Sequence, residues 1–366
     1  MHSSSPAVRR ALIALALLVS STSPARAQQH AVAPAHPAVD AMFAVYAQPG
    51  RPGASVVVIR DGRVAYERSF GLAEVETGRA VTPATDFRLA SLSKQFTATA
   101  VMLLVADGKL RYDDSLGAVL PGLPAYAHAV TLRQLLGHTG GLPDYEDLVP
   151  EGQTAQLHDA DIPALLARAP AAKFPAGTRW DYSNTGYVLL ALVVERASGA
   201  RFGDFLRDRI FVPLGMTHTV ALEEGRTTVP ERAYGYAVSF EGGVRRTDQS
   251  VTSATLGDGG IYSNVHDLAL WDRALERHTL VSAEQQRLAW TPGTLADGTR
   301  TGYGFGWFVD QDHGTTRLLH HGESRGFTNA IVRYPERRLT VIVLTNRTGG
   351  WPWDIAQAIA DAYLGK

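Results

Sequence analysis

Strand-like segments lie at both ends of this 366-residue chain, and helix-like segments fill its middle. Near the N-terminus, residues 54–59 and 64–70 flank an Asp-Gly turn, which predicts a β-hairpin. Alternating or continuous apolar runs predict four more strands near the C-terminus, at 303–309, 317–321, 327–334 and 339–344. Neither group of strands makes a complete sheet by itself. We therefore predict an α+β fold in which one antiparallel sheet is assembled from both chain ends.

The middle of the chain shows apolar residues at every third or fourth position. These segments predict helices at 93–106, 131–136, 162–169, 186–198, 202–210 and 265–277. We expect a mainly helical lobe, roughly 110–290, inserted between the two groups of strands, and flanking helices at 39–48 and 353–364. Strands do not alternate regularly with helices, which argues against a Rossmann or barrel fold. The prediction is one bilobed catalytic domain over residues 39–366.

The first 38 residues read as a targeting segment and a tether. Arg9 and Arg10 precede an apolar stretch, and Ala25-Arg26-Ala27 has the small-x-small pattern of an export cleavage site. We predict a signal peptide at 1–27, a flexible tether at 28–38, and export to the periplasm or the medium. The apolar stretch is shorter than the ~20 residues of a membrane span, so we expect no integral span.

Composition narrows the chemistry that the chain can perform. Lys and Arg number 35 against 36 Asp and Glu, so the near-zero net charge gives no general attraction to nucleic acid. The chain has no cysteine, which excludes a thiolate nucleophile and thiolate metal ligands. A catalytic nucleophile must therefore be oxygen or nitrogen, and a small molecule or peptide is the expected substrate.

Ser91-Leu92-Ser93-Lys94 is the sharpest local feature. Three residues make about one helical turn, so the Lys94 amine is expected close to the Ser91 hydroxyl, at the start of an apolar helix. A serine needs a nearby base before it can attack a carbonyl, and the N–H groups of a helix start stabilise developing negative charge. The alternative is a helix-capping serine beside a surface lysine. However, of the four lysines only Lys94 has a serine three residues before it.

A second candidate element is the Tyr-x-Asn sequence at Tyr182 and Asn184, in a polar loop before an apolar helix. Tyr182 could take the proton of Ser91 and pass it to a leaving group, while Asn184 could bond a substrate carbonyl and the lysine. Tyr262-Ser263-Asn264 repeats the triplet, but directly precedes another predicted helix. Its Ser263 or Asn264 is better explained as a helix N-cap.

A third candidate element is His320-His321-Gly322-Glu323, on and just beyond a predicted strand. His320 would offer a polar side chain to an acidic or acyl group, and Gly322 would let substrate lie against the strand backbone. We do not expect the adjacent histidines to bind metal, because consecutive strand residues face opposite sides.

The segment from Gly322 to Gly326 also matches the Gly-x-Ser-x-Gly nucleophile elbow, with Ser324 as the serine. That motif needs a strand–turn–helix context and a histidine later in the chain. No histidine follows His321, and the segment after the turn reads as a strand. We interpret this match as coincidental.

Together these elements resemble the serine β-lactamase and penicillin-binding-protein family, in the branch of class C β-lactamases, D-Ala-D-Ala carboxypeptidases, D-aminopeptidases and family VIII esterases. The resemblance covers nearly all of the chain after the predicted signal peptide. In family order, it rests on Ser91-Leu92-Ser93-Lys94, Leu135-Leu136-Gly137-His138-Thr139-Gly140-Gly141-Leu142-Pro143, Tyr182-Ser183-Asn184, Gly259-Gly260 with Asp267-Leu268, Tyr303-Gly304-Phe305-Gly306-Trp307, and His320-His321-Gly322 with Gly326-Phe327.

The resemblance implies a β-lactamase/transpeptidase-like fold and an acyl-enzyme at Ser91, assisted by Lys94 and Tyr182, with no metal or organic cofactor. It also implies an oxyanion hole made by the backbone N–H groups of Ser91 and Glu323. The chain departs from class C β-lactamases at His320, where they carry a lysine that attracts the substrate carboxylate. A histidine is charged only part of the time near neutral pH, so we expect weaker carboxylate capture.

The implied function is hydrolysis of esters or peptide-like amides, with weak β-lactamase activity at most. A Glu323 side chain facing the site would repel anions and favour neutral esters or a substrate amine. The alternative is a penicillin-recognising sensor that acylates without turnover. Oligomeric state is not encoded in any motif of the sequence.

Overall fold

The computed structural model describes residues 1–2 and 36–365. The predicted signal peptide and most of the predicted tether lie outside the described residues. Helix α1 (Pro37–Met42) begins inside the predicted tether, so residues 37–38 of the predicted tether are helical. The described residues 36–365 belong to one compact unit.

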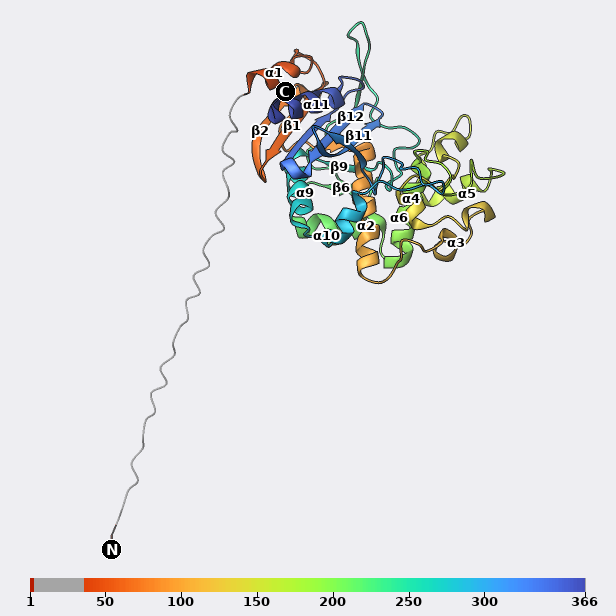
Figure 1. The fold of residues 1–366 in the computed structure, drawn as a ribbon. Helices are drawn as coiled ribbons and strands as arrows, with labels where there is room; N and C mark the ends of the chain where they lie inside the picture. The colour runs from red at the N-terminus through yellow and green to blue at the C-terminus, as the bar shows by residue number, and fades with distance from the viewer. Residues whose placement is uncertain (3–35, 366) are drawn as a thin grey trace. The chain divides into compact units, whose positions relative to one another are not determined.

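A six-stranded antiparallel sheet joins the two chain ends, as predicted (Figure 1). Its strand order is β10 (Phe308–Asp312), β11 (Thr315–Ser324), β12 (Phe327–Tyr334), β13 (Leu339–Thr345), β1 (Ala54–Arg60) and β2 (Arg63–Phe70). The N-terminal hairpin joins the C-terminal strands through β1 and β13, in a register that pairs Val57 with Ile342. Both strands are buried almost throughout, which explains their continuous apolar sequences.

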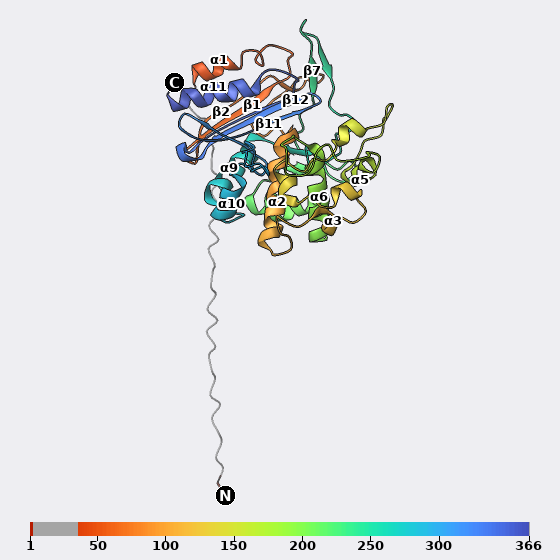
Figure 2. The ribbon, with the colours of Figure 1, turned by 45° about the vertical axis from the view of Figure 1, so that its right-hand side comes forward.

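The two faces of the sheet are covered differently. Helices α1 and α11 (Pro352–Leu364) lie on one face, where Val56, Val343 and Ile359 belong to a small core (Figure 2). On the other face, Val57 and Ile342 belong to a larger core that extends through the helical lobe. Alternate residues of one strand therefore serve two cores, as the two-residue period of a strand requires.

The lobe is built from short helices around two long apolar ones, α2 (Lys94–Ala106) and α6 (Asn184–Ser198), which pack together. Its other helices are α3 (Leu116–Val119), α4 (Leu132–Leu136), α5 (Ile162–Leu166), α7 (Phe202–Leu206), α8 (Val212–Leu214), α9 (Val265–Arg277) and α10 (Ala283–Ala289). The short strands are β3 (Leu72–Glu74), β4 (Arg79–Ala80), β5 (Phe87–Arg88), β6 (Val220–Ala221), β7 (Tyr236–Val238), β8 (Val244–Arg246) and β9 (Ile261–Ser263).

Two predicted elements are shorter in the structure. The predicted strand 303–309 contributes only its last two residues to β10, because Gly306 turns the chain with φ +76°. The predicted helix 39–48 ends at Met42 and continues as turns. Among residues 1–2 and 36–365, no helix has both the length and the apolar character needed to cross a bilayer.

Candidate active site

Ser91 lies in the 3₁₀ turn η1 (Ala90–Ser93), which leads directly into α2. The turn begins with an unusual backbone, because Ala90 has φ +51°. Ser91 is not an N-cap of either helix: Leu89 caps η1, Ser93 caps α2, and neither side chain makes a capping bond. The capping alternative for Ser91 is therefore wrong.

The Lys94 side chain is fully buried and makes three hydrogen bonds. Its Nζ donates to Ser91 Oγ at 3.1 Å, to Asn184 Oδ1 at 2.8 Å and to the Asp258 carbonyl at 2.9 Å. Three acceptors satisfy the three N–H donors of an ammonium group. Every N–H group of the Lys94 amine therefore has an acceptor, and one of the three is the candidate nucleophile.

Tyr182 lies beside this ammonium group. Lys94 Nζ is 5.0 Å from the centroid of the Tyr182 ring, a cation–π distance. The Tyr182 hydroxyl is buried and has no hydrogen-bond partner among the described residues. A buried hydroxyl without a partner is costly unless a ligand completes its hydrogen bonding, so this oxygen, which is not bonded to Ser91 Oγ in the structure, can take a partner from a bound substrate.

His138, from the predicted Gly137-His138-Thr139 motif, holds the Tyr182 loop in place. Its Nδ1 accepts a hydrogen bond from the Ser183 N–H at 3.1 Å, and its ring lies 4.3 Å from the Tyr182 ring. Burial and the nearby Lys94 ammonium lower the pKa of His138 well below its usual value, so the imidazole is neutral.

Asn184 begins α6 and is oriented from both ends. Its side-chain oxygen accepts from Lys94, and its backbone N–H donates to the Asp144 carboxylate at 3.0 Å. A second carboxylate, that of Glu146, lies near the Asn184 side chain and lines the same cleft. Burial, followed by the charge of Asp144, raises the pKa of Glu146. An amide, an ammonium group and two carboxylates therefore meet at the start of α6.

The location of His320 corrects its predicted role. Its side chain is completely buried, and both ring nitrogens are bonded: Nδ1 donates to the His321 carbonyl at 2.7 Å, and Nε2 accepts from the Tyr303 hydroxyl at 3.0 Å. Burial and the Lys94 ammonium lower the pKa of His320 well below its usual value. His320 is thus a neutral structural group and does not offer charge to a substrate carboxylate.

Gly322 also differs from its predicted role. A Cβ at this position would lie 2.2 Å from the Leu89 carbonyl oxygen, so the backbone before η1 fills the space that was expected for substrate. Gly322 instead lets the Ser91 turn pack directly on β11. Strand alternation points the Glu323 side chain to the opposite face of the sheet. The pairing of β11 with β10 ends at Leu319, so the following backbone has an open edge on that side.

The two alternative motifs occupy structural positions. Ser324 ends β11 and Phe327 begins β12, so the Gly-x-Ser-x-Gly match lies in a β-hairpin and lacks the helix that a nucleophile elbow needs. In the second Tyr-x-Asn copy, the Asn264 side chain accepts from the Asp267 N–H at 2.9 Å and caps α9, as predicted.

Ser91 opens into a cleft of roughly 430 Å³ between the lobe and the end of β11. The cleft mixes charges of both signs with hydroxyl groups. Its lining includes Arg88, Ser91, Glu146, Asn184, Ser250, Ser253, Asp258, Glu323, Ser324 and Arg325. Such a lining can hold a polar substrate against the serine.

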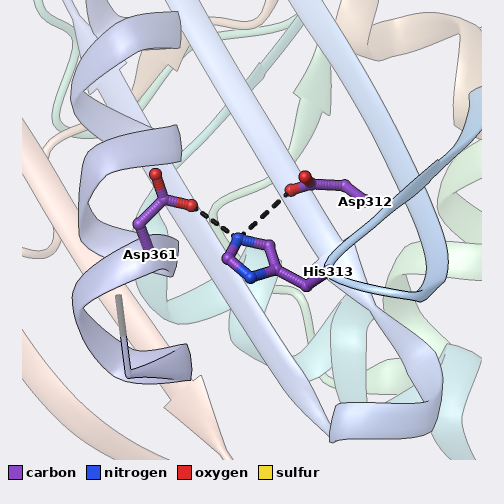
Figure 3. Close-up of side chains that lie close together, drawn as sticks. All are labelled: Asp312, His313 and Asp361. Carbon is purple, nitrogen blue, oxygen red and sulfur yellow. Dashed lines mark hydrogen bonds and ion pairs between the residues drawn. The ribbon is translucent and has the colours of Figure 1, made fainter.

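One group of described side chains has metal-ligand spacing, away from the residues predicted for catalysis (Figure 3). His313 Nε2 lies 2.8 Å from Asp361 and 3.5 Å from Asp312. The Asp312 carboxylate also accepts from Tyr334 at 2.5 Å and Gln357 at 3.1 Å. These contacts explain the cluster as a hydrogen-bonded link between the β10–β11 turn and α11.

Sequence reasoning missed Arg88, Glu146 and Asp258 as parts of this cleft. Arg88 stands three residues before Ser91, but a sequence position does not reveal whether a guanidinium is buried or solvated. Glu146 follows the Gly140-Gly141 loop of a recognised motif, which was the one signal that could have placed it near the site.

The fold and the site define a class of hydrolases. A family model described as Beta-lactamase matches residues 36–364, and the chain belongs to this family. The predicted resemblance and the β-lactamase/transpeptidase-like fold are thereby confirmed.

Individual relatives give finer comparisons. The chain is 35% identical to penicillin-binding protein 4* of Bacillus subtilis, over 80% of this chain and 68% of that protein. It is 29% identical to a D-aminopeptidase of Gluconobacter oxydans, over 87% of this chain and 61% of that protein. D-amino acid amidase from Ochrobactrum anthropi has a similar structure, with a TM-score of 0.75, 26% identity, and coverage of 89% of this chain and 99% of that chain. The chain spans about three fifths of the D-aminopeptidase's length.

Proposed function

We propose that this chain is an exported serine hydrolase that forms an acyl-enzyme at Ser91 and acts on esters or peptide-like amides. The observation that carries the proposal is the contact between Ser91 Oγ and the buried Lys94 Nζ, at 3.1 Å, in an open cleft. The D-aminopeptidase and D-amino acid amidase relatives favour amides of D-amino acids over D-Ala-D-Ala carboxypeptidase substrates.

In the proposed mechanism, Tyr182 is the base. All three Lys94 N–H groups are already engaged in hydrogen bonds, and an ammonium group has no lone pair to accept a proton, so its positive charge instead assists Tyr182 as the proton acceptor. The Ser91 proton passes to Tyr182 as the oxygen attacks the carbonyl carbon. The N–H groups of Ser91 and Glu323 would hold the resulting oxyanion.

Breakdown of this intermediate breaks the bond between the carbonyl carbon and the leaving nitrogen or oxygen, and Tyr182 returns its proton to the leaving atom. Water then attacks the acyl-enzyme, with Tyr182 again accepting a proton, and releases the acid. A neutral His320 fits this scheme, because Tyr182 carries out the proton transfers and Lys94 already supplies the positive charge beside it.

Glu146 is the proposed contact for a substrate ammonium group. Its carboxylate lines the Ser91 cleft next to Asn184, where it would pair with the free amine of an amino-acid amide. Glu146→Gln should therefore raise KM for D-alanine p-nitroanilide and leave KM for its N-acetyl derivative nearly unchanged. Equal effects on both substrates would remove this assignment.

The nucleophile is tested with a p-nitrophenyl ester and a D-alanine p-nitroanilide. We expect Ser91→Ala to abolish turnover of both, and Tyr182→Phe to lower kcat on the order of 10² or more. Ser324→Ala should keep its activity and serves as the matched control, because it removes the serine of the Gly-x-Ser-x-Gly match, which also lines the cleft. Wild-type turnover by Ser91→Ala would refute the proposal.

The relationship to penicillin-binding protein 4* supports a second candidate, a sensor that acylates but turns over slowly. Mass spectrometry after exposure to benzylpenicillin separates the two functions. An adduct at Ser91 that persists for hours would favour the sensor, whereas rapid return to the free mass would favour the hydrolase.

A further inference from the structure

Arg88 is a buried guanidinium whose charge has no ionic partner among the described residues. Its side chain is 3% exposed, and its Nε and one terminal nitrogen lack any hydrogen-bond partner there. Its one charge-related contact is with the Tyr262 ring, whose centroid is 5.9 Å away. A cation–π contact replaces only part of the hydration that the three N–H donors on these two nitrogens lose on burial. The site is therefore electrostatically incomplete.

Arg88 lines the Ser91 cleft, so a bound substrate could supply the anionic partner that Arg88 lacks. Arg88 ends β5, three residues before Ser91, and both residues line the same cleft. Arg325 brings a second guanidinium to this cleft from the β11–β12 hairpin, and Ser250 and Ser253 add hydroxyl groups. Forked N–H donors surrounded by hydroxyl groups are suited to a carboxylate.

We propose that Arg88 forms a carboxylate-binding subsite for the acyl part of the substrate. This inference rests on the proposed function, because the acyl part is defined by attack of Ser91. The leaving group must lie near Tyr182, which gives it a proton and which packs against His138, Tyr303 and Phe308. Arg88 packs instead against Tyr262 in β9, and the cleft that it lines does not include Tyr182. The subsite therefore serves the acyl side.

The substrate class that follows is an amide of an amino acid with a carboxylate side chain, in which Glu146 holds the α-ammonium group and Arg88 the side-chain carboxylate. D-Glutamate is a D-amino acid with these two groups. The α-p-nitroanilides of D-glutamate and D-glutamine are a matched pair, because they have nearly the same shape and differ by one charge.

The test compares kcat/KM for these two anilides. We expect the wild type to prefer the D-glutamate compound by about tenfold or more, and Arg88→Gln to bring this ratio close to one, mainly through KM. Arg232→Gln is the matched control: it removes a guanidinium that packs on the same Tyr262 ring, at 5.4 Å, but lies outside the Ser91 cleft. This control should leave the ratio unchanged.

A wild-type ratio near one, or an unchanged ratio in folded Arg88→Gln, would overturn the subsite. If Arg88→Gln fails to fold, Arg88→Lys keeps the charge but loses the forked donors, and should lower the ratio several-fold. An unchanged ratio in Arg88→Lys would likewise overturn it.

A binding experiment separates this inference from the proposed function. Ser91→Ala is titrated calorimetrically with D-isoglutamine, which has the side-chain carboxylate, and with D-glutamic acid diamide, which does not. We expect tighter binding of D-isoglutamine, and loss of the difference in Ser91→Ala with Arg88→Gln. This result does not require turnover, so it holds even if Ser91 proves not to be the nucleophile. Equal binding of the two compounds would count against Arg88.

Discussion

Gly322→Ala tests the inference that the Ser91 turn packs directly on β11. The added Cβ would lie 2.2 Å from the Leu89 carbonyl oxygen, whereas real Cβ contacts are essentially never shorter than 3.0 Å, so the two backbones must separate by about 0.8 Å. Overpacking of this kind typically costs 1–3 kcal/mol of folding free energy, about 2 kcal/mol at its centre. A displacement near 1 Å at a catalytic group lowers the rate by about 10².

The measurement is urea unfolding together with kcat on a p-nitrophenyl ester. Gly137→Ala is the control, because its φ of −94° suits alanine and the nearest atom to its added Cβ is 3.4 Å away. The control should change the free energy of unfolding by clearly less than Gly322→Ala does. A Gly322→Ala variant with the stability and kcat of the wild type would refute the packing argument and reopen the space beside Gly322 to substrate.

Three further predictions concern other parts of the chain. The depressed pKa of His320 means that the unfolded chain binds more protons below about pH 6.5, so this residue's contribution to stability is lost as pH falls. Burial raises the pKa of Asp159 to about 7, so the contribution of Asp159 to stability changes with pH in the opposite direction. The test is therefore a comparison of variants: between pH 5 and 7, the free energy of unfolding in urea should depend less on pH in His320→Gln than in the wild type. An identical pH dependence in both proteins would contradict the role of His320. Cell fractionation and mass spectrometry should find an exported chain beginning at Gln28, whereas an uncut cytoplasmic chain would contradict the export proposal. His313→Ala should lower the melting temperature and EDTA should leave that of the wild type unchanged, since hydrogen bonds account for the cluster; a large loss with EDTA would indicate a metal.

The spacing of apolar residues was enough to predict the fold, because it is typical of strands at both chain ends and of helices in the middle. The hairpin near the N-terminus and the strands near the C-terminus each make only part of a sheet, and the pairing of β1 with β13 joins them. The segment 303–307 was misjudged because its alternation resembles a strand. In the structure, Gly306 packs so closely on α2 that an added Cβ would lie 2.9 Å from the Lys94 carbonyl oxygen, and the chain turns there instead.

Spacing predicted the Ser91–Lys94 pair because both residues belong to one turn and local geometry fixes their distance. It could not predict the environment of His320, which depends on packing against Tyr303 and Tyr182 from distant segments. Arg88 was missed for the same reason. Its missing partner is visible only when every neighbouring acceptor is known, and a sequence does not supply that information.

The burial of His320 and the unpaired charge of Arg88 have a common electrostatic basis. A lysine at position 320 would place a second ammonium group in the dry space next to Lys94, and like charges in a low-dielectric interior repel strongly. A neutral imidazole avoids this repulsion and still accepts the Tyr303 hydrogen bond. Without a cation at that position, the site keeps no charge there for an anionic substrate group. The buried cation that lines the cleft without an ionic partner among the described residues is Arg88, so recognition of a carboxylate should come from the acyl side in this chain.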